Sequence, residues 1–475
     1  MNHRPIKDPF VFIIFGASGD LARIKLFPSI YDLYINNKLD ADFLIYGFAR
    51  SKNTEEEFRK FFEKSIRDKR KNINESALKN LLEKIYYVCG QYNDINDYHK
   101  LFDEIKKHQF THKIRKIAYF SVPPQVFKDL INNLGQVKTD TKENIKLVIE
   151  KPFGEDGSSA RKLFHSVSKY FNEDDIYLLD HYLGKTGVQS ILPLRYDNSI
   201  LNLMLKGNAI KNIQITIKEE VGIDQRAGYF DQVGIIKDMF QSHLLQILAL
   251  ITMYIPVVYN PRNIQREKYN ILSALRYPNE TQKIILGQYA TYRTEKDVPA
   301  SSLTPTFVAM ELFIDQVDFY KVPIYIRAGK KLNSRSAYIV VEFKKLPFQQ
   351  DKNAPTNKLI LELHPNEKIH IRLVKKQADD GMIVYDDIVT SDTLTCDKKA
   401  CFEAYGRLIL EMLNEDKTNF LSFPEIIECW RLTDYLYKFM DKQNTPTIIY
   451  HDNSNGPEQQ NNLIQSEGNE WYEIH

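Results

Sequence analysis

Cysteine is scarce in this sequence: it occurs four times among 475 residues, and no two copies form a CxxC pair. A disulfide scaffold requires dense cysteine, and a cysteine-ligated metal site usually requires paired spacing, so neither is supported here. We expect free, buried thiols in a reducing compartment, and we predict no metal site. The four positions are Cys89, Cys396, Cys401 and Cys429.

An excess of charge of one sign is also missing, because 64 Lys and Arg residues face 62 Asp and Glu residues. This balance gives no support to nucleic-acid binding through a basic surface. The longest apolar stretch, 244–259, is broken by polar residues and proline and is too short to span a bilayer. The polar start of the chain leads into an apolar run that ends at a glycine loop, so no secretory leader is expected. We therefore predict a cytoplasmic protein that binds neither membranes nor nucleic acids.

The first third of the sequence alternates apolar runs with helical patterns. The continuous apolar run 9–15 is typical of a strand buried on both faces, and 43–48, 114–122 and 145–149 look similar. The helical patterns between and after them are 55–71, 76–87, 97–108 and 124–134. This rhythm predicts an α/β, Rossmann-type, doubly wound parallel sheet.

The rhythm changes after about Asp180, where regular crossover helices no longer separate the strand-like runs. These runs are 213–218, 306–313, 337–343, 358–364 and 368–374. They predict a larger α+β domain with a mainly antiparallel sheet. The segments 221–230 and 261–299 contain long polar connections that we expect to be substrate loops, and we expect the stretch 452–462 to lie loosely on the surface. The predicted domains are 1–179 for the cofactor and 180–475 for substrate binding and oligomerisation.

A glycine loop, GASGDLA at 16–22, follows the first predicted strand and precedes a predicted helix. Gly16 permits a tight turn, Gly19 allows a pyrophosphate to approach the backbone, and Ala22 allows close helix packing. The alternative is a glycine turn without a ligand, but its placement between strand and helix favours a dinucleotide site. The candidate cofactor residues of this loop are Gly16, Ala17, Ser18, Gly19, Asp20 and Leu21.

The second predicted strand is followed by Arg50, where a site for NAD would carry an acid to bind the ribose 2′-hydroxyl. A guanidinium can instead hold a 2′-phosphate through a forked contact. The alternative is a solvated basic loop, since Lys52 lies close by. We infer a preference for NADP over NAD.

Another conspicuous motif, EKPFG at 150–154, follows the predicted strand 145–149. The carboxyl end of such a strand is where open α/β sheets bind ligands, so Lys151 is a candidate contact for both cofactor and substrate. Pro152 can adopt a cis bond, which other residues rarely do. The alternative is a simple exit from the strand with an exposed lysine.

The stretch DHYLGK at 180–185 brings together a carboxylate, an imidazole, a phenol and an ammonium group. Such a set is costly to hold in one place unless a polar ligand lies among its members. His243 lies on an apolar helical stripe within 235–250 and should face inward. A core histidine is the alternative, but an aspartate such as Asp180 could orient its ring and leave the second nitrogen as a base.

These motifs together resemble the glucose-6-phosphate dehydrogenase family, from Gly16 to about Pro457. Further matching stretches are 228–243 (GYFDQVGIIKDMFQSH), 327–335 and 404–410 (AYGRLIL). The resemblance implies oxidation of the C1 hydroxyl of glucose 6-phosphate to a lactone, with hydride passed to NADP. By family pattern His243 is the base and Asp180 its partner, and Lys25, Arg50 and Tyr119 fall in cofactor- or ligand-contact motifs. Homodimers or homotetramers are also implied.

A sugar phosphate needs cationic and phenolic donors for its phosphate and carboxylate acceptors for its hydroxyls. His181, Tyr182 and Lys185 suit the phosphate, whereas Glu219 and Asp238 suit the hydroxyls. The complete candidate substrate set implied by the resemblance is Lys151, His181, Tyr182, Lys185, Glu219, Asp238, Lys330 and Arg335. Each of these residues taken alone is more commonly a solvated surface charge.

The sequence departs from some family members at a second, structural NADP site. Two positions that are basic there are Ser336 and Val340 here, so that second site is in doubt. Two other functions remain open at this point. One is a non-catalytic NADP sensor, which the pair His243 and Asp180 argues against. The other is a dehydrogenase of an unphosphorylated sugar, which the group His181, Tyr182 and Lys185 argues against.

Overall fold

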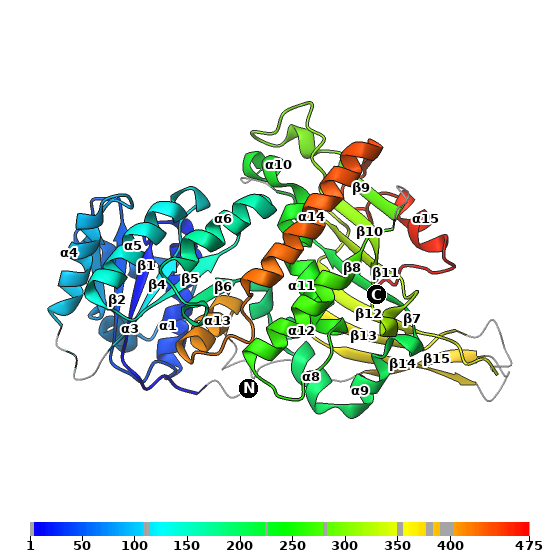
Figure 1. Cartoon of the computed structure of the whole chain (residues 1–475), viewed down its shortest axis with the longest axis horizontal. Helices are drawn as coiled ribbons and strands as arrows, with labels where there is room; N and C mark the ends of the chain where they lie inside the picture. The colour runs from blue at the N-terminus through cyan, green and yellow to red at the C-terminus, as the bar shows by residue number, and fades with distance from the viewer. Residues whose placement is uncertain are drawn as a thin grey trace. The chain divides into compact units, whose positions relative to one another are not determined.

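The chain folds into two compact units in the computed structural model, whose elements are labelled in Figure 1. The first contains Met1–Lys185 and Asp397–Ile427, and the second contains Thr186–Cys396 and Glu428–His475. The described residues are 4–108, 110, 114–223, 227–278, 283–348, 355–376, 383–389 and 402–474. These units differ from the predicted domains, because the first runs on to Lys185 and also takes in a segment from much later in the sequence.

The first unit contains a parallel sheet of six strands in the order β3-β2-β1-β4-β5-β6. The strands are β1 (Phe10–Phe15), β2 (Phe43–Ala49), β3 (Ile85–Cys89), β4 (Arg115–Phe120), β5 (Ile145–Glu150) and β6 (Ile176–Leu179). This order confirms the predicted Rossmann-type fold. The strand order reverses between β1 and β4, so the crevice at their carboxyl ends is the place where such sheets bind ligands.

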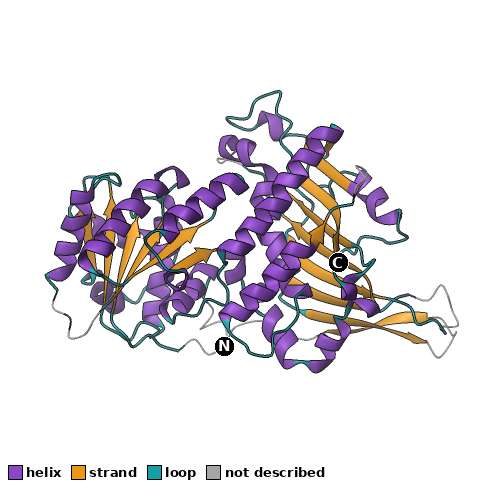
Figure 2. Ribbon diagram, in the orientation of Figure 1, coloured by secondary structure: helices purple, strands orange, loops and turns teal. Residues whose placement is uncertain are grey.

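Helices cover both faces of this sheet (Figure 2). They are α1 (Phe27–Ile35), α2 (Glu55–Arg67), α3 (Glu75–Leu82), α4 (Ile95–Lys106), α5 (Phe127–Thr141) and α6 (Gly157–Ser168). Their ends follow from local sequence: α2, for example, begins at a capping box in which Thr54 accepts from the Glu57 N–H and Glu57 accepts from the Thr54 N–H. The helix α1 packs with α2 and α3, whereas α4 packs with α5 and α5 with α6.

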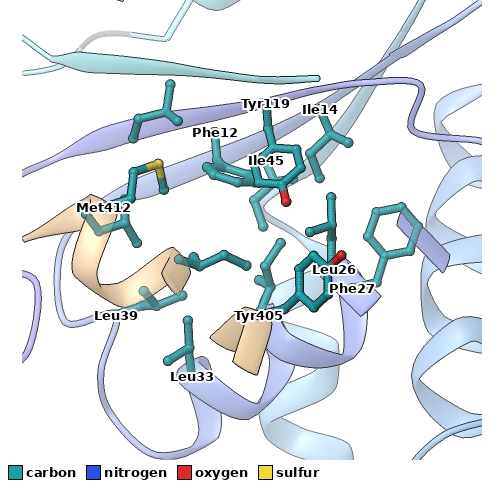
Figure 3. Packing of buried hydrophobic residues seen from close by; sticks show 14 of the residues in the cluster. Phe12, Ile14, Leu26, Phe27, Leu33, Leu39, Ile45, Tyr119, Tyr405 and Met412 are labelled. Carbon is teal, nitrogen blue, oxygen red and sulfur yellow. The ribbon is translucent and has the colours of Figure 1, made fainter. Parts of the chain in front are cut away.

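The core of the first unit is completed by a helix from far along the chain, α13 (Ala404–Leu413). Figure 3 shows Tyr405 and Met412 of this helix facing a cluster that includes Phe12 and Tyr119 of the sheet and Leu33 of α1. The sequence prediction placed this segment in the second domain. All residues from Tyr405 to Leu413 are buried, and the apolar side chains of α13 join one cluster with residues of the sheet and of α1, α2 and α3.

The second unit is built on a sheet of ten strands, in the order β15-β14-β13-β12-β7-β11-β10-β9-β16 with β8 paired to β10. These pairs are antiparallel except β7 with β11 and β9 with β16, which confirms the predicted mainly antiparallel sheet. The strands are β7 (Ile210–Lys218), β8 (Leu275–Arg276), β9 (Ile284–Tyr289), β10 (Phe307–Ile314), β11 (Ile324–Gly329), β12 (Ser336–Phe343), β13 (Lys358–His364), β14 (Ile369–Lys376), β15 (Ile383–Val389) and β16 (Thr447–Tyr450).

The remaining helices lie mostly in the second unit. They are α7 (Thr186–Gln189), α8 (Ile191–Asp197), α9 (Ser199–Met204), α10 (Ala227–Ile235), η7 (Ile236–Leu244), α11 (Leu245–Thr252), α12 (Pro261–Ala274), α14 (Phe423–Gln443) and α15 (Gln459–Gln465). The segment η7 is a π-helix, and α14 begins in the first unit. Among the described residues, no helix combines the length and apolarity needed to cross a bilayer.

Several sequence predictions about local structure were wrong. The segment 261–299 also contains regular structure that was not predicted, namely α12, whose N-cap Asn260 accepts from the Asn263 N–H, and the strand β9. The helix predicted over 76–87 ends at Leu82, and the β-branched and aromatic residues that follow form β3. The stretch 452–462 is anchored rather than loose, since Gln460 is buried. Residues 224–226 of the predicted loop 221–230 lie outside the described residues.

The thiol prediction holds only in part. Cys429 is buried, but Cys89 is partly exposed, and neither forms a disulfide within the described part of the chain. Cys396 and Cys401 lie outside the described residues. The exposure of Cys89 arises because β3 is the edge strand of the first sheet.

Candidate active site

The glycine loop lies at the point where the first sheet reverses its strand order. Gly16 has a φ of +86°, and a Cβ at this position would lie 2.2 Å from the carbonyl oxygen of Ser121, the residue that follows β4. Its own N–H donates to Phe48 O at 2.8 Å, and the Gly19 N–H donates to Gly16 O at 2.9 Å. Only glycine fits at position 16. The helical backbone begins a few residues later, by Leu21, with φ −63° and ψ −45°. The loop thus has the geometry of a pyrophosphate site at a helix N-terminus.

Arg50 lies beside this loop, one residue beyond the end of β2. The Ser18 and Ser51 hydroxyls are 3.0 Å apart, which joins the glycine loop to the Arg50 loop. The Arg50 side chain is exposed, and its guanidinium carbon lies 5.4 Å from the centroid of the Tyr92 ring. The structure thus brings the predicted phosphate loop and the predicted 2′-phosphate ligand together. A solvent-facing guanidinium held over an aromatic ring can still reach an incoming phosphate.

The other cofactor candidates of this region have different surroundings. Asp20 is exposed and forms an ion pair of 2.9 Å with Arg23, so its carboxylate is engaged within the helix start. Ala17 is fully buried, and Lys25 lies partly exposed on the π-helix Ala22–Leu26 that leads into α1. The Lys25 side chain can therefore reach a cofactor at the surface. Ala17 contributes to the loop through the small size of its side chain.

Tyr119 is in the core rather than at the surface. Its side chain is fully buried, and its hydroxyl donates to Glu150. Tyr405 of α13 donates to the other carboxylate oxygen of Glu150 at 3.1 Å. Burial raises the pKa of Glu150 to about 7, although the two hydroxyl donors oppose this shift. The structure thus gives the Tyr119 ring a packing and hydrogen-bonding role, and no surface through which the ring could contact a cofactor.

Lys151 follows Glu150 at the carboxyl end of β5 and is partly buried. The Lys151–Pro152 peptide is cis, as the motif suggested. Gly154 has a φ of +87°, and a Cβ there would lie 2.6 Å from the Ala160 backbone nitrogen. The motif is therefore a tight, glycine-dependent exit from the strand that leaves Lys151 at the ligand-binding edge of the sheet.

The DHYLGK stretch directly follows β6, at that same edge of the sheet. Asp180 is fully buried, and its carboxylate accepts the Tyr182 N–H at 3.0 Å, which caps a 3-10 helix over His181–Gly184. The Lys185 ammonium lies 3.3 Å from the centroid of the Tyr182 ring. The structure therefore clusters a cation, a phenol and an imidazole within one short turn. Such a group suits an anion with several acceptor oxygens.

Two residues that the sequence analysis did not single out hold this turn in place. The Arg407 guanidinium of α13 donates from Nε to Gly184 O at 2.8 Å. The Tyr405 ring lies parallel to the His181 ring, with centroids 6.3 Å apart and an angle of 9°. A Cβ at Gly184 would come within 2.6 Å of Ala404 O, so the turn and the helix are in close contact. The AYGRLIL motif was the available signal, because it combines an aromatic and a buried cation on an otherwise apolar helix.

A second cluster of candidate residues lies in the second unit. The Lys330 ammonium contacts the Glu219 carboxylate at 2.5 Å and the Asp238 carboxylate at 3.0 Å. The Lys330 side chain is 10% exposed, while the two carboxylates are about a third exposed. Burial alone would lower the pKa of Lys330, but Asp238 and Glu219 outweigh it and raise that pKa. One ammonium between two accessible carboxylates is suited to binding vicinal hydroxyls.

His243 belongs to the same π-helix, η7, as Asp238 and is 3% exposed, as its inward-facing stripe predicted. Residues five apart lie about 140° apart around an α-helix, since each residue turns about 100°. A π-helix is wider, with i→i+5 hydrogen bonds, so residues five apart lie closer to one side than they would in an α-helix. The inward-facing position predicted for His243 is confirmed, although the segment is a π-helix and not the α-helix that the predicted period assumed.

Two expectations about the second unit remain predictions. Arg335 is exposed in the connection between β11 and β12, and its contact with the sugar phosphate stays a prediction. Asp180 belongs to the first unit and His243 to the second, and the pairing of their side chains stays a prediction.

Comparison with known proteins extends this description to the whole chain. Residues 13–190 match the family described as glucose-6-phosphate dehydrogenase, NAD binding domain. Residues 192–472 match the family described as glucose-6-phosphate dehydrogenase, C-terminal domain. The two matches follow one another with almost no gap and together span most of the sequence.

Individual relatives agree with these matches. A chloroplastic glucose-6-phosphate 1-dehydrogenase from Nicotiana tabacum is 35% identical over 465 residues, covering 94% of this chain and 78% of the tobacco protein. A cytoplasmic glucose-6-phosphate 1-dehydrogenase from Arabidopsis thaliana is 34% identical, covering 96% of this chain and 91% of the relative. A solved structure of glucose-6-phosphate dehydrogenase in complex with its substrate glucose-6-phosphate superposes with a TM-score of 0.91 at 29% identity, over 99% of both chains.

Proposed function

The chain belongs to the glucose-6-phosphate dehydrogenase family, and we propose that it oxidises glucose 6-phosphate at C1 to 6-phosphogluconolactone with hydride transfer to NADP. This reaction is the first step of the oxidative pentose phosphate pathway. The observation that carries the proposal is that both halves of the family, nucleotide-binding and C-terminal, match here almost end to end. The clusters around Gly16, Lys185 and Lys330 supply the groups that this reaction requires.

The residues of the first unit fit the cofactor. The positive φ of Gly16 and the lack of room for a Cβ leave a backbone cradle at the switch point of the sheet. Exposed Arg50 beside that cradle suits the 2′-phosphate. We propose that Gly16, Ala17, Ser18, Gly19, Asp20, Leu21, Lys25, Arg50 and Lys151 form the cofactor site. When bound, NADP supplies the nicotinamide ring that accepts the hydride.

The chain's own residues position the sugar and move its proton. His181, Tyr182 and Lys185 hold the phosphate of the substrate, and Glu219 and Asp238 accept hydrogen bonds from its hydroxyls. Lys330, Arg335 and Lys151 add positive charge. His243 removes the proton from the C1 hydroxyl, and Asp180 accepts the Nδ1–H of that ring and stabilises its protonated form. Binding at the remote phosphate orients C1 for the reaction.

A spectrophotometric assay with a panel of sugar phosphates and both nicotinamide cofactors tests the proposal. We expect NADPH formation with glucose 6-phosphate and far slower turnover with free glucose. Binding of NADP without turnover of any sugar would favour the non-catalytic sensor. Equal rates with glucose and its 6-phosphate would favour a dehydrogenase of unphosphorylated sugars.

Replacing Arg50 with alanine should raise the KM for NADP by about 10- to 100-fold. This range follows from the roughly 1.5–3 kcal/mol that a charge-assisted contact contributes. NAD lacks the 2′-phosphate and is therefore the internal control, with a KM that should barely change. Steady-state kinetics with both cofactors measure the effect. Equal losses for the two cofactors would assign Arg50 to the structure of the loop rather than to cofactor choice.

Replacing Lys185 with alanine should reduce kcat/KM for glucose 6-phosphate by about 10- to 100-fold, because one charge-assisted phosphate contact is lost. Free glucose has no phosphate, so its slow turnover should stay nearly unchanged. The two substrates are compared under identical conditions on one preparation. A similar loss for both substrates, with the fold intact, would mean that Lys185 supports the turn through its contact with Tyr182 and that the phosphate binds elsewhere.

The assembly and location of the protein are also proposals. We propose a homodimer or homotetramer built through the second unit, which sedimentation analysis would test. We propose a cytoplasmic enzyme, although the relatives include both cytoplasmic and chloroplastic proteins. No nucleic-acid or membrane partner is proposed.

A further inference from the structure

Two neighbouring strands of the second unit lead directly into candidate sugar-binding residues. The strands β7 and β11 are parallel partners, and Lys218 at the end of β7 lies opposite Gly329 at the end of β11. Glu219 is the residue after Lys218, and Lys330 is the residue after Gly329. The positions of these two strand ends therefore determine where the Glu219 carboxylate and the Lys330 ammonium meet.

The opposite face of the same two strands carries two buried cations. Side chains alternate between faces along a strand, so Lys218 and Arg327 lie on the face opposite Glu219 and Lys330. Lys218 is 4% exposed and Arg327 is 2% exposed. One carboxylate joins them: Glu473 contacts the Lys218 ammonium at 2.5 Å and the Arg327 guanidinium at 2.7 Å. Without Glu473, two buried positive charges would face each other on adjacent strands.

The segment around Glu473, here called the clasp segment (469–474), is firmly attached to this face. The Asn469 amide donates to the Tyr325 hydroxyl at 3.1 Å, and the Tyr472 N–H donates to the Gln214 side chain at 2.9 Å. The Arg327 guanidinium lies 4.3 Å from the centroid of the Trp471 ring. The clasp segment thus contacts residues of both β7 and β11.

Apolar contacts also attach the clasp segment to the neighbouring strands. Tyr472 and Ile474 pack against the buried cluster of Tyr338, Val340 and Ile360. Val340 is one of the two positions where some family members carry a basic residue for a second NADP. In this chain it is fully buried within that cluster.

The charges of this cluster depend on one another. Burial lowers the pKa of Lys218, and the positive charge of Arg327 lowers it further, while Glu473 opposes both effects. Burial alone would raise the pKa of Glu473, but Arg327 and Lys218 outweigh it and hold that pKa below its usual range. Glu473 is therefore ionised at neutral pH and keeps both cations in place. Arg327 also donates to the Thr216 hydroxyl of β7 at 3.0 Å, which ties the two strands together on this face.

We propose that Glu473 is a positioning residue for the sugar site, acting through Lys218 and Arg327 to hold the ends of β7 and β11 that present Glu219 and Lys330. The inference deepens the proposed function and rests on it, because it takes Glu219 and Lys330 to be sugar ligands. Glu473 acts from the face opposite the sugar and makes no contact with the reacting atoms. Its effect should therefore fall on sugar affinity rather than on cofactor binding.

The test is the Glu473→Gln variant of the full chain, compared with Glu470→Gln as a matched control. Glu470 is exposed and belongs to the same segment, and the Gln214 side chain donates to its backbone oxygen at 2.9 Å, a contact that Glu470→Gln leaves in place. We expect Glu473→Gln to raise the KM for glucose 6-phosphate about ten-fold, the size of one charge-assisted contact. The KM for NADP should stay within about two-fold, since the cofactor residues belong to the other unit, and Glu470→Gln should match the wild type.

A second variant separates positioning from a general loss of stability. Adding Lys218→Met to Glu473→Gln removes one of the two uncompensated cations and should recover part of the sugar affinity. A lower Tm for Glu473→Gln with both KM values unchanged would overturn the proposal, as would an equal rise of both KM values. If the wild type turns over no sugar, the proposed function fails on its own. Calorimetric binding of glucose 6-phosphate to the wild type and both variants then still tests the role of Glu473.

Discussion

Replacing His243 with asparagine should lower kcat by about 10²–10⁴-fold, the usual loss when a general base is removed. Asparagine keeps the approximate size and polarity of the side chain but cannot take up the proton of the C1 hydroxyl. The KM for glucose 6-phosphate should change little, because the proposed phosphate and hydroxyl ligands are other residues. Stopped assays over long times would measure the residual rate. An asparagine variant that turns over at the full rate would exclude His243 as the base.

A partner test distinguishes a catalytic pair from two independent residues. Asp180→Asn should also lower kcat, because the ring of His243 would lose its orienting acceptor. If the two residues act as one unit, the double variant should lose less than the product of the two single losses. Fully multiplicative losses would instead show that Asp180 contributes through the capping bond that it makes to the Tyr182 N–H at 3.0 Å.

Replacing Lys330 with methionine should reduce kcat/KM for glucose 6-phosphate by roughly 30- to 100-fold. Truncating one partner of a buried charge pair costs roughly 2–5 kcal/mol. We expect the lower end, because the carboxylates of Glu219 and Asp238 are about a third exposed and solvent screens them. The two carboxylates would then repel each other where the sugar hydroxyls should bind. Steady-state kinetics at several sugar concentrations provide the measurement.

The matched control for this variant is Lys331→Met. Lys331 lies next to Lys330 but does not share its ion pairs to Glu219 and Asp238. Its φ of 55° is no more strained for methionine than for lysine, because neither side chain is branched at Cβ. It should retain nearly full activity. Adding Asp238→Asn to Lys330→Met should relieve the repulsion between the two carboxylates. It should therefore recover part of the free energy of unfolding that this repulsion costs in Lys330→Met. Equal effects of the two lysine variants would show that the connection after β11, rather than the Lys330 ammonium, is what matters.

The general fold could be predicted from the sequence because its evidence is local. The strands β1, β2, β4 and β5 are short segments made mostly of apolar residues, which the sequence shows directly. The strand β3 was missed because IYYVC follows a helical pattern without a break, so nothing in the sequence marks Leu82 as the end of the helix. The attachment of α13 to the first sheet was also missed, since an amphipathic stripe shows that a helix is buried but not against which sheet.

Some features of the candidate site could likewise be predicted from the sequence, and others could not. Gly16 and the 180–185 turn could be found because all their chemistry lies in short, consecutive stretches. The π-helix that carries Asp238 and His243 was not predicted, because the sequence pattern was interpreted with an α-helical period. The contacts of Glu150 with Tyr405 and of Glu473 with Lys218 join residues about 255 positions apart. A single sequence carries no signal for such pairs, because only the packed structure brings them together.

The late position of α13 also has a consequence for how the protein is made. The helix begins at Ala404, about 225 residues after the end of β6 at Leu179. At a synthesis rate of roughly 5–20 residues per second, the ribosome needs about 11–45 s to reach it. During that interval the surface of the first sheet that α13 later covers, which includes Tyr119, remains uncovered. The first unit is thus the earliest to begin folding on the ribosome. It cannot complete its core until most of the second unit has been translated. We expect chaperones to protect the exposed surface during this interval.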